Sequence, residues 1–275
     1  MNDPTRFELD ARARAMLEEM GVRVWWPMPE AQMQTGTDAG TDVGAPVTQG
    51  SAVAAGRVKP PEPKAPVVPA AAAVVASGLL PQVQDLDWAA LEQAVQKCQA
   101  CGLCNSRKNT VFGAGDVQAQ WMVIGEAPGE NEDLQGQPFV GQAGKLLDNM
   151  LRAIGLDRQA TGQAGVYIAN TLKCRPPGNR NPEPQELATC APYLVRQVQL
   201  VKPKIILAMG RFAVQSLLQT TEPIGKLRGR VHQYQGVPVV VTYHPAYLLR
   251  NPADKAKAWA DLCLALQAQQ AGTAG

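Results

Sequence analysis

Short apolar blocks separated by helical patterns constrain the fold of this chain more than any other feature. The three clearest blocks are Trp121–Gly125, Val166–Leu172 and Ile205–Met209. Continuous apolar runs of this length are typical of strands buried on both faces of a sheet. Helical spacing follows in Gln142–Ile154 and in Glu183–Val201, where Pro192 predicts a kink or a break. This alternation predicts an α/β fold with a parallel sheet covered by helices on both faces.

The end of the chain continues the pattern. Val231–Tyr234 and Val237–Tyr243 flank Gly236 and predict a hairpin-like pair of strands. A helix over Pro252–Gln270 is expected to close the fold.

The segment before residue 86 has a different composition. Between residues 31 and 80, alanine, glycine, proline and valine fill 32 of 50 positions, and no aromatic residue occurs. Such a segment cannot bury enough apolar surface to offset its conformational entropy, so residues 31–85 are predicted to be a disordered linker. Residues 1–30 are predicted to be a short N-terminal helical segment in which Trp25 and Trp26 are a candidate docking element for a protein partner. Residues 86–275 then form the folded domain.

Charge and targeting signals narrow the function classes. Residues 1–85 hold 7 basic and 10 acidic residues, whereas residues 86–275 hold 19 and 14, a net charge of +5. A basic excess in the folded domain is compatible with nucleic-acid binding but does not establish it. The N-terminus has no signal-peptide pattern, and no run of 18 apolar residues occurs. We therefore expect a cytoplasmic protein with no membrane partner.

The six cysteines are a second strong signal. In a reducing compartment they predict metal binding or catalysis rather than disulfides. Two lie in a C-x2-C pair and two follow later in the chain, with 15 residues between them: Cys98, Cys101, Cys174 and Cys190. Four thiolates suit either zinc or an iron–sulfur cluster. Cys104 extends the first pair to C-x2-C-x2-C, but we interpret Cys104 and Cys263 as small buried hydrophobic residues.

Candidate ligand-binding residues follow the predicted strands. Ligands of open α/β sheets bind beyond the carboxyl ends of the strands. Four segments occupy such positions: the loop that begins at Gly125, Asn170, Gly210-Arg211, and the segment that begins at His244. They offer a carboxylate, an amide and an imidazole to a polar ligand.

Four motifs in these segments resemble those of family-4 uracil-DNA glycosylases, the bacterial and archaeal iron–sulfur enzymes. They are GEAPGENED (125–133), PFVG (138–141), Asn170 followed by KCRPPGNRNP (173–182), and HPAYLLRNP (244–252). The resemblance covers residues 95–265. It implies a three-layer α/β/α fold around a central, mainly parallel four-stranded sheet. It also implies a monofunctional DNA repair hydrolase that flips uracil out of single- or double-stranded DNA and leaves an abasic site. We expect a nucleoid-associated monomer.

The resemblance also assigns the cysteines. It implies that the four spaced thiolates hold a 4Fe–4S cluster with a structural role, through Cys98, Cys101, Cys174 and Cys190. Zinc in the same four thiolates remains the alternative.

Uracil removal requires extraction of the base, recognition of its Watson–Crick edge, a placed water and stabilisation of the leaving anion. The resemblance places the uracil site at Gly125, Glu126, Ala127, Phe139, Asn170 and His244. Asn170 is expected to read uracil O4 and N3–H, and Phe139 to stack on the base. His244 would donate to uracil O2, and Glu126 would orient water, so these two are the candidate catalytic residues. Three of these residues have a structural alternative: Phe139 in the core, Asn170 bonded to strand-end backbone groups, and His244 as a helix cap or a core histidine.

The first motif departs from the better-known uracil-DNA glycosylase families. There an aspartate positions the water and a tyrosine blocks the thymine methyl group, whereas Ala127 and Gly129 stand at those positions here. Glu126 lies one residue earlier and is the candidate water-orienting carboxylate. The sequence does not identify what excludes thymine.

The last motif is expected to face DNA. Leu248 and Leu249, in a predicted loop, are candidate wedges that hold the flipped nucleotide out. Arg250, Arg175 and Arg228 are candidate phosphate contacts. Two other functions remain open: a non-catalytic iron–sulfur DNA-binding protein of the same fold, and a glycosylase with a broader range of deaminated bases. Families of the second kind tend to carry an apolar residue where Glu126 stands.

Overall fold

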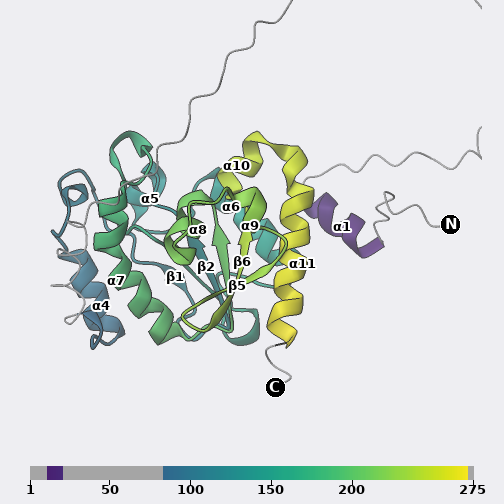
Figure 1. The fold of residues 1–275 in the computed structure, drawn as a ribbon, viewed down its shortest axis with the longest axis horizontal. Coiled ribbons are helices and arrows are strands. Elements are labelled where there is room, and N and C mark those ends of the chain that lie inside the picture. Colours follow the sequence, from purple (N-terminus) through teal and green to yellow (C-terminus); the bar gives the residue numbers. More distant parts are fainter. Residues whose placement is uncertain (1–10, 21–82, 272–275) are drawn as a thin grey trace, which may run out of the picture. The chain divides into compact units, whose positions relative to one another are not determined.

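The computed structural model describes residues 11–20 and 83–271, which include a six-stranded sheet of order β1-β3-β2-β4-β6-β5 (Figure 1). The strands are β1 (Ala114–Gly115), β2 (Trp121–Gly125), β3 (Val166–Asn170), β4 (Ile205–Met209), β5 (Val231–Tyr234) and β6 (Val237–Thr242). The four central strands are parallel, and β1 and β5 pair antiparallel at the two edges. The predicted four-stranded parallel sheet is therefore the centre of a wider one.

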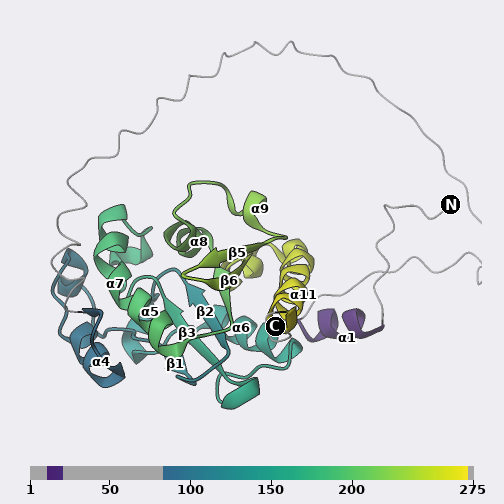
Figure 2. The ribbon, with the colours of Figure 1, turned by 60° about the horizontal axis from the view of Figure 1, so that its bottom comes forward.

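Helices cover both faces of the sheet (Figures 1 and 2). On one face pack α6 (Gln142–Ala153) and α11 (Lys255–Ala271), and on the other pack α7 (Pro184–Val201) and α8 (Arg211–Leu218). The other helices of residues 83–271 are α4 (Trp88–Gln96), α5 (Glu130–Gln135), α9 (Ile224–Leu227) and α10 (Pro245–Arg250). Turns of 3₁₀ helix occur at Gly102–Asn105, Gly162–Ala164, Pro177–Asn179 and Pro252–Asp254. The three-layer α/β/α architecture is confirmed.

The apolar runs of the parallel strands follow from this layering. Successive side chains of a strand point to opposite faces. Trp121 and Val123 of β2 pack in the core cluster with α6 and α11, whereas Met122 and Ile124 pack in the cluster with α7 and α8. Both faces are thus buried, and the strand has no polar position along its length.

Two boundaries differ from the sequence-based prediction. The helix α7 continues through Pro192 without a break. The folded domain begins before residue 86, because Val83 is 3% exposed and packs with Leu91, Val95 and Tyr193.

The N-terminal segment is described only in part. The predicted N-terminal helix is present as α1 (Ala11–Glu19), and Leu17 is buried. Trp25, Trp26 and the predicted linker up to residue 82 lie outside the described residues. No helix of the described part is long and apolar enough to cross a membrane.

Candidate active site

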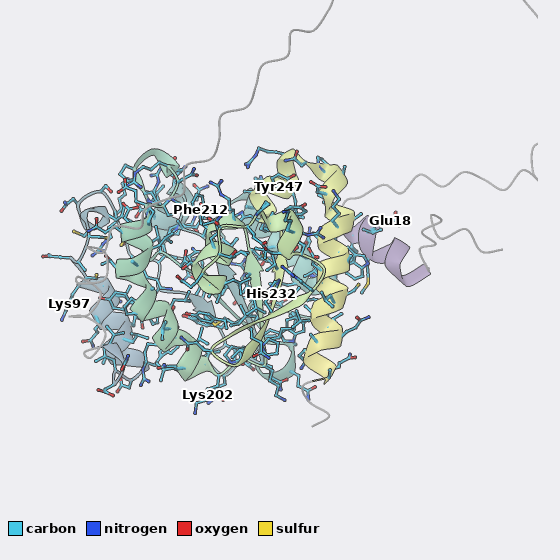
Figure 3. All side chains as sticks on the ribbon, viewed as in Figure 1. Glu18, Lys97, Lys202, Phe212, His232 and Tyr247 are labelled. Carbon is cyan, nitrogen blue, oxygen red and sulfur yellow. The ribbon has the colours of Figure 1, made fainter. Side chains whose placement is uncertain are left out.

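The carboxyl ends of the parallel strands open onto a cleft of about 880 Å³. Phe212 and Tyr247, which line it, lie at the end of the domain opposite Lys202, which precedes β4 (Figure 3). All four segments that the sequence predicts to follow strand ends contribute to its walls. The predicted uracil-site residues that line the cleft are Glu126, Ala127, Phe139, Asn170 and His244.

Gly125, the last residue of β2, packs closely against two residues that line the cleft. A Cβ atom at this position would lie 2.4 Å from Asn170 Oδ1 and 2.6 Å from Phe139 Cζ. Real Cβ atoms do not approach other atoms so closely. Glycine at the end of β2 therefore allows the amide and the aromatic ring to converge over the strand end.

Asn170 presents its side-chain amide at the end of β3. The residue is 2% exposed, and its carbonyl oxygen accepts a 2.7 Å hydrogen bond from Lys173 Nζ. Within the described residues Asn170 forms these hydrogen bonds through its backbone, and the residue lines the cleft. The alternative in which this amide caps strand-end backbone groups does not describe the observed contacts.

His244 is both a helix cap and a cleft residue. Its Nδ1 accepts a 3.1 Å hydrogen bond from the backbone N–H of Ala246, at the N-terminus of α10. A ring nitrogen that accepts carries no proton, so the neutral ring has its proton on Nε2. Burial lowers the pKa of His244 to about 4, against a smaller opposing effect of Glu132. The cap thus fixes the tautomer that can donate from Nε2.

Phe139 combines the two roles that the sequence left open. It is 5% exposed, belongs to the core cluster with α6, and lines the cleft. Its ring stacks on that of His244 with centroids 5.2 Å apart and an interplanar angle of 25°. Its φ of 54° lies in the left-handed region, and its carbonyl would be 1.8 Å from a Cβ at Gly144. Glycine at that position of α6 therefore lets the Phe139 backbone approach the helix.

Glu126 faces the N-terminus of α8. Burial raises the pKa of its carboxyl group, while a hydrogen bond from the Phe212 backbone N–H and the charge of Arg211 lower it by smaller amounts. A side chain at Gly210 would come within 3.2 Å of His244 Cβ and 3.7 Å of Glu126 Oε2. The two candidate catalytic residues thus both lie close to this glycine.

The structure adds Glu132, which sequence reasoning did not select. Its carboxylate accepts backbone hydrogen bonds from Gly129 at 3.1 Å, Val140 at 3.0 Å and Gly141 at 3.4 Å. It therefore ties the loop after β2 to the segment that carries Phe139. A glutamate at the third position of a short helix that follows glycine is a capping signal that could have identified it.

Asn179 is a second addition to the cleft wall. It has a φ of 54°, and its Oδ1 accepts a 2.7 Å hydrogen bond from Arg175 Nε. Arg175 also lies 3.6 Å from a carboxylate oxygen of Glu130. The predicted phosphate contact Arg175 thus orients a residue of the wall.

Two of the predicted DNA contacts are wrong. Leu248 is 0% exposed and packs in the core, because the predicted loop is the helix α10. Its neighbour Leu249 is 44% exposed and remains a candidate. Arg228 Nε forms a 2.7 Å ion pair with the buried Asp261, and its guanidinium lies over the ring of Tyr243. Its charge is therefore already paired inside the domain.

The four predicted metal ligands converge behind β3. One cavity is lined by Cys98 and Cys101 after α4, Cys174 after β3, and Cys190 on α7. Cys104 lines the same cavity and is only partly buried, so its interpretation as a small buried hydrophobic residue is not confirmed. Within the described residues, no group of three or more His, Cys, Asp or Glu side chains is placed to hold one metal ion.

The chemistry around the thiols fits a group that binds thiolates. Burial raises the pKa of Cys174 and raises that of Cys190 to about 12, so an empty site would hold neutral thiols. Arg107 Nη1 donates a 2.9 Å hydrogen bond to Cys174 Sγ, and Lys173 lines the same cavity. Two cations beside buried thiols favour an anionic occupant.

Comparison with known proteins agrees with the geometry. A family model of the uracil DNA glycosylase superfamily matches residues 112–263. A type-4 uracil-DNA glycosylase of Saccharolobus solfataricus is 47% identical over 58% of this chain and 75% of the relative. A type-4 enzyme of Archaeoglobus fulgidus is 43% identical over 58% of this chain and 81% of the relative.

A third type-4 enzyme, from Pyrobaculum aerophilum, is 38% identical over 65% of this chain and 93% of the relative. The match therefore extends over nearly the whole of that relative. Together with the family model and the two other relatives, it places this chain in the uracil DNA glycosylase superfamily, as a member of its type-4 family.

Proposed function

We propose that the protein excises uracil from DNA by hydrolysing the N-glycosidic bond and leaves an abasic site. The observation that carries the proposal is the meeting of four groups in one cleft. They are the Asn170 amide, the neutral imidazole of His244, the ring of Phe139 and the carboxylate of Glu126.

Base recognition falls to Asn170. Its amide nitrogen can donate to uracil O4 while its amide oxygen accepts from N3–H, a pattern that cytosine presents in reverse. Because the amide is almost fully buried beside Gly125, a base that leaves it unpaired loses substantial binding energy. Phe139 offers the face on which the extruded base would stack.

His244 supports departure of the base. As the glycosidic bond breaks, negative charge builds up on uracil O2, and a donor from Nε2 stabilises it. With a pKa of about 4, the imidazole is neutral near pH 7, so it donates a hydrogen bond and keeps its proton. The Ala246 cap holds the ring in this state before substrate binds.

Glu126 serves the sugar side of the reaction. In its ionised form the carboxylate can orient a water toward C1′ and offset the positive charge of the oxocarbenium-like sugar. The Phe212 N–H and the nearby Arg211 favour that ionised form against the burial of the group.

Contacts to the DNA backbone are expected along the edge formed by α10. Arg250 lines the cleft next to the exposed Leu249. An arginine can contact phosphate while an apolar neighbour enters the space left by the flipped base. We therefore assign the wedge role to Leu249 alone, whereas the sequence predicts it for both Leu248 and Leu249.

A 4Fe–4S cluster is the cofactor that we propose for Cys98, Cys101, Cys174 and Cys190. Four thiolates of one chain can hold such a cluster, and these four cysteines line a single cavity. The hydrogen bond from Arg107 to Cys174 Sγ supports an anionic, thiolate-bound group there. When bound, it would supply a cross-link between the end of α4, the segment after β3, and α7.

Excision by purified full-length protein tests the proposal. The substrates are single- and double-stranded oligonucleotides that contain one uracil, hypoxanthine or xanthine. Alkali-labile abasic sites should form faster at uracil than at the other two bases. Glu126→Gln serves as the matched control with nearly unchanged shape. Folded, iron-containing protein that releases no base would support the non-catalytic alternative, and faster release of hypoxanthine than of uracil would support the broader glycosylase.

A further inference from the structure

Lys173 is a buried cation that the proposed reaction does not use. It is 1% exposed, and it forms no ion pair with a carboxylate in the described part of the chain. Its Nζ donates to Asn170 O at 2.7 Å and to Gln197 Oε1 at 2.6 Å. Both partners are neutral, so the charge of the ammonium still requires an anion.

Lys173 also borders the cysteine site, because it lines that cavity together with Cys174 and Cys190. Cysteines that bind a metal group do so as thiolates, so an occupied site would place negative charge beside the ammonium of Lys173. The same side chain therefore borders the cysteine site and holds the backbone of the base-reading residue.

The segment from Asn170 to Lys173 also supports the catalytic loop. The Thr171 N–H donates to Gly125 O at 3.0 Å, and the Leu172 N–H donates to Glu126 O at 3.1 Å. A shift of this segment would displace the Asn170 amide and the Glu126 backbone together.

Gln197 fixes the position of the ammonium. It is 0% exposed on α7, and its Nε2 donates to Phe112 O at 2.9 Å and to the Tyr167 hydroxyl at 3.1 Å. A buried network in which each member is satisfied has one low-energy arrangement. Gln197 therefore gives Lys173 a fixed anchor in the core.

We propose that Lys173 is a positioning residue that couples the cysteine site to uracil recognition by holding the Asn170 carbonyl. The proposal rests on the proposed function of the cleft. It predicts that removal of the ammonium weakens binding of the uracil base specifically, in addition to any effect on the cysteine site.

Lys173→Met, which keeps an unbranched side chain of nearly the same length and removes its charge, is the main test. Binding is measured by fluorescence anisotropy on an oligonucleotide with 2′-fluoro-2′-deoxyuridine, which resists cleavage, and on the matched abasic oligonucleotide. Binding of the fluorinated uracil DNA should weaken about tenfold, with little change for abasic DNA, and the excision rate should fall by ~10²-fold. Iron per chain is measured on the same samples.

Arg107→Gln is the matched control. Arg107 donates to Cys174 Sγ on the same site, and its hydrogen bonds in the described part of the chain do not involve Asn170. The fraction of this variant that retains its iron should therefore keep the parental preference for uracil over abasic DNA. If Lys173→Met is too unstable to purify, Gln197→Met is tested instead. Its binding of the fluorinated uracil DNA should weaken a few-fold, with little change for abasic DNA.

Parental uracil preference in whichever variant folds would overturn the coupling, as would equal losses on uracil and abasic DNA. A parent protein that neither binds the fluorinated uracil DNA better than a thymine control nor excises uracil would instead contradict the proposed function.

Discussion

The cleft and the cysteine site lie at the two ends of one short segment, Asn170–Cys174, and differ in construction. The cleft is open, and its polar side chains are held in place through atoms that do not face a ligand. The Ala246 N–H, for example, holds the His244 ring through Nδ1 and leaves Nε2 available. The cysteine site is closed by apolar side chains such as Val95 and Leu103, and its polar groups bond one another. The construction of the cleft suits binding of a ligand, whereas that of the cysteine site suits stabilisation of the surrounding fold.

Loss of a cysteine ligand should have the largest effect. Cys98→Ser, or the same change at Cys174, should reduce the iron content from about four per chain to near zero and remove the brown colour. The excision activity and much of the soluble protein should be lost as well, because the thiols would be left buried and unpaired. Cys263→Ser should keep its iron. Iron analysis of anaerobically purified protein checks this, and stoichiometric zinc in place of iron would contradict the cluster.

Gly125→Ala should damage the cleft and spare the cysteine site. The added methyl group would meet Asn170 Oδ1 and the ring of Phe139, and displacement of such groups by about 1 Å costs ~10²-fold in rate. Single-turnover excision should fall accordingly at parental iron content. Parental activity would show that Gly125 does not pack against these two residues as closely as described.

The pH dependence should distinguish the two candidate catalytic residues. Burial raises the pKa of Glu126. As the pH falls, its carboxylate therefore becomes protonated at a higher pH than that of an exposed glutamate. The pKa of His244 is lowered to about 4, so this residue stays neutral above that pH. The acid limb of kcat/KM should therefore lie above the ordinary glutamate range and be absent from Glu126→Gln. An acid limb near pH 6.5 that only His244→Ala removes would reverse the assignment.

The two adjacent leucines of α10 should give the smallest functional effects and opposite readouts. Leu248→Ala should destabilise the protein by about 2–5 kcal/mol, because it leaves a cavity in the core. Leu249→Ala should leave the free energy of unfolding within about 0.5 kcal/mol and slow excision from duplex DNA a few-fold. Urea unfolding and duplex assays on both variants check this, and equal destabilisation by the two would contradict the orientation of the helix.

Sequence patterns identified the elements whose signal is local. The blocks Trp121–Gly125 and Ile205–Met209 are strands with the predicted bounds, because burial on both faces leaves an uninterrupted apolar run. The strand β1 has two residues, one of them glycine, and carries no such run. The helix α10 is six residues long and begins with proline. So short a segment shows too little helical periodicity, and its sequence therefore predicts a loop.

Residues whose role depends on distant partners could not be predicted. Arg228 looked like a free phosphate contact, but its partner Asp261 lies 33 residues later in the chain. Lys173 likewise depends on Gln197, 24 residues away on α7. By contrast, His244 and Asn170 were identifiable because a strand end alone determines where their side chains lie.

Stabilisation of the leaving base by a neutral His244 can be measured in the His244→Ala variant. Its single-turnover rate of uracil excision and its affinity for an abasic duplex are measured beside those of the parent. We expect a rate lower by ~10²–10³ with abasic affinity nearly unchanged, because abasic DNA lacks the atom that the donor binds. A parental rate, or a loss of abasic affinity in proportion to the loss of rate, would show that His244 does not stabilise the leaving base.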